Sequence, residues 1–479
     1  MTHTEFRQRA HELADWMADY FENVAQYPVK PAVSPGDIKA QLPEHPPIAS
    51  EPFEALMDDF QKIILPGMTH WSHPQFFAYF PTGNSAPSVL AEMLTATMGA
   101  QCMIWQTSPA AEELEERVME WLRDMLGLPS DWVGVIQDTA STATLAALIT
   151  AREQATEWAV NQRGFYQSAR LRVYASAQAH SSILKDVRIA GYGEDNLVYI
   201  PTDDAYAMIP EALEQAILAD LEQGYLPACA IAAVGTTSST AIDPLRPIGE
   251  ICRRHGVFLH VDAAYAGAAL LLPEMRGLIE GIEQADSLVF NPHKWMFTNF
   301  DCTAYFVRNK SSLLRSFSIL PEYLKTPEDQ LVNNYRDWGI PLGRRFRALK
   351  LWFVIRTYGV EGLQGKIRSH IEYGQRLAAV IAAAPDFELM APVSLNLVCF
   401  RYRPQAALSP EDLDRLNEQL LLRLNASGRI LLTQTRLSGR YVLRMVAGQT
   451  DAIWEEMEKG WQLVRSEERR VGKECRSRW

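Results

Sequence analysis

The sequence predicts an α/β protein with a mainly parallel, seven-stranded sheet in a large domain, an N-terminal helical segment and a small α+β C-terminal domain. Between about residues 86 and 350, short and almost continuously apolar segments alternate with helical stretches. This alternation is typical of parallel strands that helices cover on both faces. The length of 479 residues, with 47% hydrophobic and 22% charged side chains, suits a globular protein of two or three domains.

The N-terminal segment, residues 1–85, does not enclose a core of its own. An amphipathic helix is predicted over residues 5–25, with one apolar stripe. The stripe consists of Phe6, Leu13, Met17, Tyr20 and Phe21. A proline-rich and extended stretch over residues 28–47 follows the helix. We therefore expect this segment to pack on a partner subunit.

Seven short apolar strands are predicted in the large domain, residues 86–350, mostly with helical stretches between them. In chain order they are VGVIQ (133–137), RVYAS (172–176), LVYIP (197–201), CAIAAVG (229–235), VFLHVD (257–262), SLVF (287–290) and TAYFV (303–307). A helix over residues 344–358 leads into the small domain, residues 351–464, whose strands are expected near 395–402 and 441–448.

Composition excludes several classes of function. The net charge of −12 argues against a general nucleic-acid binder and does not favour an anionic membrane surface. Residues 1–24 lack the apolar core of a signal peptide, and no long apolar run predicts a transmembrane helix. The six cysteines are scattered without a CxxC pair. They are expected to fill core positions in a reducing cytosol, so we expect a cytoplasmic protein without a metal site.

The last residues, 465–479, have a different composition, with six Arg or Lys, three Glu and almost no apolar side chain. They resemble the translation of a sequencing-adapter read-through, so we treat them as a non-native tail and leave them out of the fold argument. The alternative is a basic tail that binds nucleic acid or membrane.

Lys294 and Asp262 follow two neighbouring predicted strands, at the point where each strand ends. Ligands of open α/β sheets bind at the carboxyl ends of strands. A lysine and an aspartate there suit pyridoxal 5′-phosphate, because the lysine amine can bond to its aldehyde and the carboxylate can keep its ring nitrogen protonated. The alternative is a surface lysine beside a core strand.

A polar turn after the strand over residues 133–137 suits the phosphate of this cofactor. Thr139, Ala140 and Ser141 open a helix, whose free N–H groups and positive end attract anions. The alternative is an ordinary helix cap. Asn291, just before the lysine, can donate to the same phosphate. Asp138 precedes the turn, and because its carboxylate would repel a phosphate, we expect it to point away or to cap the helix.

Several motifs in one order strengthen this prediction: FFAYFPT, DTAS, AHSS, HVDAAYAG, NPHKW and PLGRRFR. Together they resemble the pyridoxal-phosphate group II decarboxylases, and within them the aromatic L-amino-acid decarboxylases, over nearly the whole chain to about residue 464. The resemblance implies a fold-type-I homodimer with active sites at the subunit interface. Close relatives often have glycine at the position of Asp138, so the sequence departs from the family pattern beside the cofactor phosphate, where affinity for the cofactor is set.

The resemblance also implies roles for single residues. His180 is the histidine that stacks on the cofactor ring, and Ala264 is the small residue on the opposite face. Thr237 provides a hydroxyl near Asp262 or the ring oxygen, and His293 belongs to the cofactor-binding motif. Tyr323, in a polar stretch between prolines, is the loop tyrosine that returns a proton to the substrate α-carbon. The alternative for Tyr323 is an exposed or packing side chain.

The substrate pocket implied by the resemblance is aromatic and apolar. Its residues are Trp71, Tyr79, Phe80, Pro81, Thr82, Met103, Ile104 and Gly343, with Met103 and Ile104 coming from the partner subunit. Histidine-specific relatives carry a serine at the position of Gly343, so the glycine favours a wide pocket. The predicted substrate is a small aromatic amino acid, with a preference for tryptophan-like or broad substrates.

Three rival functions remain open on sequence alone. An aromatic aldehyde synthase shares the scaffold, but relatives of that kind typically have phenylalanine at the position of Tyr323. A decarboxylase for acidic or basic amino acids does not match the aromatic pocket. A non-catalytic homologue that serves as a binding or scaffold protein does not need Lys294, Asp262, His180 and Tyr323 together.

Overall fold

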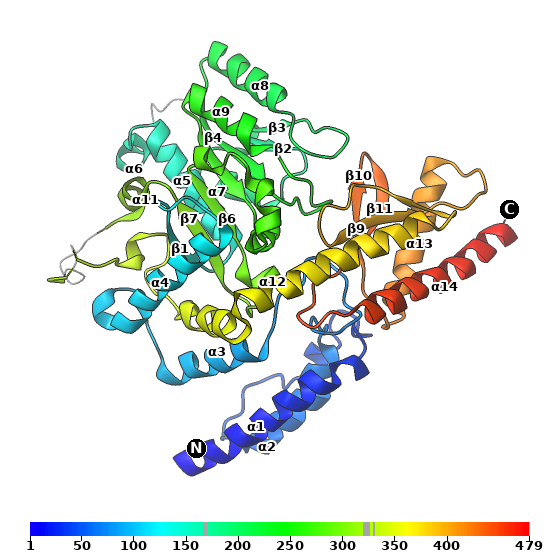
Figure 1. The fold of residues 1–479 in the computed structure, drawn as a ribbon. Helices are drawn as coiled ribbons and strands as arrows, with labels where there is room; N and C mark the ends of the chain where they lie inside the picture. Colours follow the sequence, from blue (N-terminus) through cyan, green and yellow to red (C-terminus); the bar gives the residue numbers. More distant parts are fainter. Residues whose placement is uncertain (166–169, 320–325, 329–330, 479) are drawn as a thin grey trace. The chain divides into compact units, whose positions relative to one another are not determined.

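The computed structural model describes residues 1–165, 170–319, 326–328 and 331–478. The chain forms two compact units (Figure 1). The large unit comprises Thr82–Glu372 and Ala391–Leu397, and the small unit comprises Met1–Pro81, Tyr373–Met390 and Val398–Trp479. The boundaries predicted at residues 85, 350 and 464 stay a prediction.

The large unit is built on a seven-stranded sheet with the strand order β1-β7-β6-β5-β4-β2-β3. The strands are β1 (Val133–Gln137), β2 (Leu171–Ser176), β3 (Leu197–Ile200), β4 (Leu226–Ala233), β5 (Phe258–Asp262), β6 (Ser287–Phe290) and β7 (Thr303–Val307). From β3 to β6 all neighbours are parallel, whereas β7 runs antiparallel to both β6 and β1. The predicted α/β fold with a mainly parallel sheet is confirmed.

Helices flank this sheet (Figure 1). They are α3 (Ala86–Met98), α4 (Pro109–Leu126), α5 (Ala140–Ala155), α6 (Ala159–Arg163), α7 (Ser182–Ile189), α8 (Pro210–Glu222), α9 (Leu245–His255), α10 (Pro292–Trp295) and α11 (Lys310–Phe317). Helix α5 packs small side chains such as Ala143, Ala147 and Ala151 against Val173 of β2 and Ile231 of β4 in one buried cluster. Small residues let a helix approach a sheet closely, so the start of α5 is held firmly at the end of β1.

The small unit contains a four-stranded sheet with the order β10-β11-β9-β8. Its elements are α1 (His3–Asn23), α2 (Phe53–Asp59), β8 (Phe387–Leu389), β9 (Leu397–Tyr402), α13 (Pro410–Ala426), β10 (Thr433–Leu437), β11 (Arg440–Val446) and α14 (Trp454–Arg478). Helix α12 (Arg347–Ala382) leads into it and is broken at Gly359, whose φ of 65° lies in the left-handed region. Helix α12 begins near the predicted start but extends well beyond residue 358.

Chain segments from both ends of the sequence pack together in the small unit. Val29, Phe76, Ala78 and Leu431 form one buried cluster, and the Val29 N–H donates to the carbonyl oxygen of Gly428 at 2.8 Å. Helix α1 itself buries none of its residues. The backbone of residues 465–478 continues α14, and Arg465 forms an ion pair with Asp386. The assignment of residues 465–479 as a non-native tail stays a prediction.

Candidate active site

Lys294 lies on α10, a single helical turn that directly follows β6. The next residue, Trp295, is fully buried, stacks on Tyr265 with ring centroids 4.9 Å apart and donates from Nε1 to Nδ1 of His370 at 2.9 Å. The Asn291 N–H donates to the carbonyl oxygen of Ala264 at 3.0 Å, which ties the turn to the segment after β5. The lysine therefore stands on an anchored turn at the carboxyl end of the sheet.

Gly83 closes the other side of this turn. Its N–H donates to the carbonyl oxygen of His293 at 2.8 Å. A Cβ atom at this position would lie 2.6 Å from the Cα of Phe297 and 2.8 Å from the carbonyl oxygen of Lys294. Only glycine allows two backbones to approach so closely. The predicted pocket residue Thr82 is the chain neighbour of Gly83, so it lies beside the lysine turn.

Asp262 ends β5, the parallel neighbour of β6, and pairs in register with Val289. Its Oδ1 accepts a hydrogen bond from the Ala264 N–H at 3.0 Å, which fixes the carboxylate. Desolvation lowers the pKa of Lys294, and the negative charge of Asp262 acts in the opposite direction. The predicted pair of lysine and aspartate is thus close enough for its charges to interact.

His180 shares this electrostatic environment. Although the residue as a whole is exposed, desolvation of the ring lowers its pKa. Asp262 opposes that shift and Lys294 adds to it. Nδ1 accepts a hydrogen bond from the Ser182 N–H at 3.1 Å. A backbone N–H can only donate, so the neutral ring carries its proton on Nε2. The structure therefore brings His180, Asp262 and Lys294 together.

The predicted anion turn, Thr139 to Ser141, lies at the start of α5. Thr139 is its N-cap, and the Thr139 Oγ1 accepts from the Thr142 N–H at 3.4 Å. Ala140 and Ser141 form the first turn and are partly exposed. The Asp138 Oδ1 accepts a hydrogen bond from the adjacent Thr139 N–H at 2.7 Å, and the expectation that its carboxylate points away from a phosphate or caps the helix stays a prediction.

Thr303 connects this turn to Asn291. The Thr303 hydroxyl lies 2.7 Å from Oδ1 of Asn291 and 3.0 Å from the carbonyl oxygen of Asp138. Thr303 and Asn291 are both buried. Because the amide oxygen of Asn291 is engaged inside the protein, its NH2 group is the end available to an anion.

His293 belongs to the same turn as Lys294. It is 3% exposed, and its Nδ1 accepts from the Cys302 N–H at 3.0 Å. Burial lowers its pKa to about 3, and the charge of Lys294 acts in the same direction. The ring is therefore neutral and held by backbone groups. This arrangement fits support of the turn more closely than the predicted contact with a cofactor, which stays a prediction.

The remaining predicted residues fall into separate groups. Ala264 is partly buried beside Asp262, and Thr237 is exposed in the loop after β4. In the small unit, Trp71 and Tyr79 stack with ring centroids 5.7 Å apart, next to the buried Phe80 and Pro81. Tyr323 lies outside the residues that the structure describes.

Met103, Ile104 and Gly343 lie on two segments of the large unit, near residues 102–104 and 336–344, that backbone hydrogen bonds join. The Cys102 N–H donates to the carbonyl oxygen of Arg344 at 2.9 Å, and the Arg336 N–H donates to that of Met103 at 3.1 Å. Arg344 is buried and its guanidinium contacts Glu115 Oε1 at 2.6 Å. The backbone hydrogen bonds thus bring the segments of the three predicted pocket residues together, and the ion pair anchors Arg344 to α4.

Sequence reasoning missed Gly83, Thr303 and the support from Trp295 and Arg344. Gly83 directly follows the motif FFAYFPT, and Arg344 lies within PLGRRFR, so these two motifs could have indicated both residues. Nothing in a local pattern indicates Thr303, because its contacts join strands that only the sheet order brings together.

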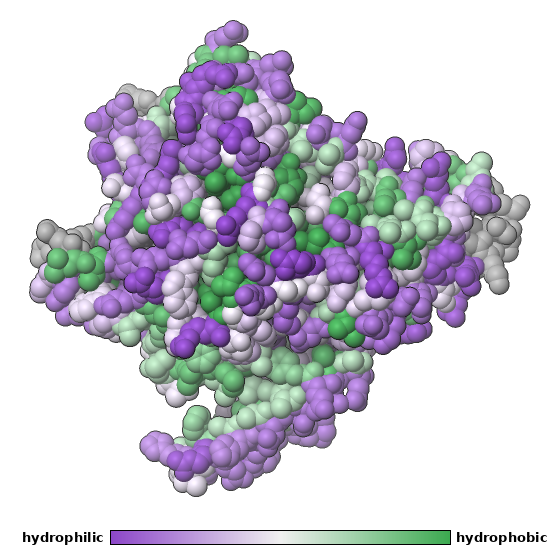
Figure 2. Space-filling model, viewed as in Figure 1, coloured by the Kyte–Doolittle hydropathy of each residue, from purple (hydrophilic) through white to green (hydrophobic). Residues whose placement is uncertain are grey.

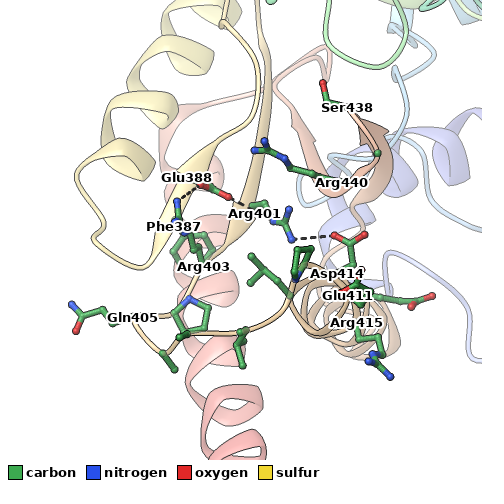
Figure 3. A pocket seen from close by; sticks show the side chains of 18 of the residues that line it. Phe387, Glu388, Arg401, Arg403, Gln405, Glu411, Asp414, Arg415, Ser438 and Arg440 are labelled. Atoms are coloured by element: carbon green, nitrogen blue, oxygen red, sulfur yellow. Dashed lines mark hydrogen bonds and ion pairs between the residues drawn. The ribbon is translucent and has the colours of Figure 1, made fainter.

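A cavity of about 1300 Å³ lies in the small unit (Figure 3). It holds none of the predicted site residues. Its charged side chains pair with one another, Arg401 with Asp414 at 3.1 Å and Arg403 with Glu388 at 2.9 Å. Among the described residues, no group of three or more His, Cys, Asp or Glu side chains could hold a metal ion.

Comparison with known proteins gives the family. Residues 35–403 match the pyridoxal-dependent decarboxylase conserved domain. The chain belongs to the pyridoxal-dependent decarboxylase family. An aromatic-L-amino-acid decarboxylase of Sus scrofa is 42% identical over 478 residues, 95% of this chain and 96% of that protein. A phenylacetaldehyde synthase of Arabidopsis thaliana is 41% identical, over 98% of this chain and 96% of that protein.

A solved structure extends this similarity to the whole fold. Oryza sativa TDC with PLP and tryptamine superposes with a TM-score of 0.95 and 37% identity, over 98% of this chain and 99% of that chain. The enzyme is a pyridoxal-phosphate-dependent carboxy-lyase, and the predicted family and cofactor are confirmed. The described side chains fit this cofactor: an amine of lowered pKa, a fixed carboxylate beside it, and two sets of N–H donors for a phosphate.

Proposed function

We propose that this enzyme decarboxylates aromatic L-amino acids to arylalkylamines and carbon dioxide. The observation that carries the chemistry is the close electrostatic contact of Lys294, Asp262 and His180 at the carboxyl ends of parallel strands. The substrate class is supported by similar proteins whose names or titles mention aromatic L-amino acids, phenylacetaldehyde or tryptamine.

Each residue of the site has a defined task in this proposal. Bound pyridoxal phosphate supplies an electron sink for the bond that breaks at the substrate α-carbon. Lys294 holds the cofactor and, with its lowered pKa, exchanges protons readily. Asp262 holds a proton at the ring nitrogen. His180 would stack its ring on the bound cofactor, as the family resemblance implies, and its Nε2–H could donate to the substrate carboxylate.

Substrate selectivity follows from the pocket residues. As the family resemblance implies, Trp71 and Tyr79, which stack on each other, would provide aromatic faces, and the partner subunit's Ile104 would provide an apolar wall. A Cβ atom at Gly343 would meet Nε2 of Gln101 at 3.2 Å, so a larger residue there would displace Gln101 or narrow the space. A wide pocket suits indole and catechol rings as well as phenyl rings.

The active unit in this proposal is a cytoplasmic homodimer. Helix α1 buries no residue, and α3 exposes Leu90, Met93, Leu94 and Met98 along one side. Figure 2 shows hydrophobic surface over α3 and along one side of α1. Apolar helix faces of this kind are typical of subunit interfaces. Among the described residues, no helix is long and apolar enough to cross a membrane. A fully active monomer in sedimentation at micromolar concentration would contradict the dimer.

The test of the reaction is a panel of L-amino acids with separate detection of amine, carbon dioxide, aldehyde and hydrogen peroxide. We expect amine and carbon dioxide in equal amounts from tryptophan, phenylalanine, tyrosine or DOPA, and little turnover of glutamate, lysine or histidine. Faster turnover of an acidic or basic substrate would refute the aromatic assignment.

An aldehyde synthase is the second candidate, since one similar protein is a phenylacetaldehyde synthase. Tyr323 argues for the decarboxylase through the family resemblance. If its hydroxyl returns the proton to the α-carbon, Tyr323→Phe should let dissolved oxygen oxidise the decarboxylated substrate. With oxygen and water consumed, the product should shift from amine toward aldehyde, ammonia and hydrogen peroxide, with cofactor binding unchanged. A variant that makes only amine at the parent rate would place the proton donor elsewhere. Aldehyde from the parent enzyme would favour the synthase.

A further inference from the structure

Thr303 lies on β7, the strand between β1 and β6. It is the first residue of β7 and pairs in register with Gln137, the last residue of β1. On the other side, Ala304 pairs with Phe290, the last residue of β6. The anion turn at Thr139 follows β1, and Asn291 and the lysine turn follow β6. Thr303 therefore stands between the two segments that supply donors for an anion.

The Thr303 hydroxyl is the donor in its contacts with Asn291 and Asp138. This hydroxyl has one proton, which it donates to the nearer acceptor, Asn291 Oδ1 at 2.7 Å, while the Asp138 carbonyl oxygen at 3.0 Å is a second acceptor that can share this proton. With Oδ1 of Asn291 bound in this way, the NH2 group of the same amide points to the other side. Rotation of the amide by half a turn would instead present an oxygen to an anion and repel it.

We propose that Thr303 is a positioning residue for the cofactor phosphate. Its hydroxyl sets the orientation of the Asn291 amide and fixes that amide relative to the backbone at Asp138, where α5 begins. This inference rests on the proposed roles of Asn291 and of the Thr139–Ser141 turn in phosphate binding. The alternative is that Thr303 only fills space in a buried sheet.

Thr303→Val tests the proposal, because valine has nearly the same shape and cannot donate. We expect apoenzyme of this variant to bind pyridoxal phosphate about tenfold more weakly, the loss of one hydrogen bond that supports a charged group. Binding of pyridoxal, which lacks the phosphate, should not change. Thr303→Ser, which keeps the hydroxyl, should bind both ligands as the parent does. Affinities are measured by titration of apoenzyme, followed by absorbance and protein fluorescence.

Two controls separate positioning from general damage. Thr150→Val removes another buried hydroxyl, one that donates to the Ala146 carbonyl oxygen within α5, and should leave both affinities unchanged. In an Asn291→Ala background, Thr303→Val should have no further effect on phosphate-dependent affinity.

The outcomes distinguish this inference from the proposed function. Equal loss of affinity for both ligands in Thr303→Val, or a full additional loss in the Asn291→Ala background, would overturn the positioning role and leave the function intact. Parent enzyme that does not prefer pyridoxal phosphate over pyridoxal would overturn the phosphate site itself, and this inference with it.

Discussion

Replacement of Gly83 by alanine tests whether the lysine turn needs its exact backbone position. Gly83 has an ordinary backbone conformation, since its φ is not in the left-handed region, so the added methyl group acts only through contacts. The new Cβ would lie 2.6 Å from Phe297 Cα, 2.8 Å from Phe297 N and 2.8 Å from the carbonyl oxygen of Lys294. All three atoms are backbone, so no side-chain rotation can relieve the contacts.

The size of the effect follows from these distances. Ordinary contacts between such atoms begin near 3.4 Å, so the turn must move by about 0.6–0.8 Å. A displacement of about 1 Å at a reacting group costs about a hundredfold in rate. We therefore expect Gly83→Ala to lower kcat/KM by about ten- to a hundredfold. Overpacking should also destabilise the fold by about 1–3 kcal/mol.

The assay combines steady-state decarboxylation, the visible absorbance of bound cofactor and thermal unfolding. Gly365→Ala in α12 is the matched control, because its Cβ would meet nothing within 4 Å. That control should keep full activity and gain a little stability, since alanine favours a helix over glycine. Unchanged activity and unchanged Tm in Gly83→Ala would refute the close approach of the two backbones.

Three further changes have defined outcomes. Lys294→Ala should lose the visible absorbance of bound cofactor and essentially all turnover; a borohydride-reducible cofactor adduct in this variant would contradict the assignment. Asp262→Asn should lower kcat by several orders of magnitude, which rapid-quench kinetics would check, because a ring nitrogen without a carboxylate partner is a poor electron sink. Glu112→Gln should change how stability depends on pH. Burial, with the nearby charge of Glu115, raises the pKa of Glu112 to about 8 from 4.5. The folded state therefore holds this proton more tightly than the unfolded chain, and its stabilisation is lost as the pH rises from about 4.5 to 8. Glutamine is neutral throughout, so the variant's Tm should fall less than the parent's between pH 5 and pH 8.

The strands could be predicted closely from sequence because their apolar runs are nearly continuous. All seven strands of the large sheet are present, and β1, β6 and β7 have the predicted bounds. The pairing of Lys294 with Asp262 was also predictable, because the ends of neighbouring parallel strands lie at one edge of a sheet. Local sequence and one topological rule were enough for these features.

Strand order and direction could not be predicted in the same way. An apolar run such as TAYFV does not encode whether a strand runs parallel or antiparallel, so the place of β7 between β1 and β6 was not foreseen. The role of Thr303 depends on that place. Likewise, the sequence does not reveal that the buried His293 accepts from the Cys302 N–H, because this hydrogen bond joins the lysine turn to the segment just before β7.

The position of β7 has a consequence for how the enzyme folds. Its pairing with β6 closes a short loop that contains the lysine turn. The contacts that hold the lysine turn therefore join residues that are close in the sequence. Its pairing with β1 joins segments separated by most of the large unit, and such long-range contacts form late because the intervening chain must first become ordered. We therefore expect the anion turn to join the lysine turn late in folding. A cofactor that needs both turns binds only the finished sheet, and by mass action it should protect the amides of β1 from hydrogen exchange more than those of β3 at the opposite edge.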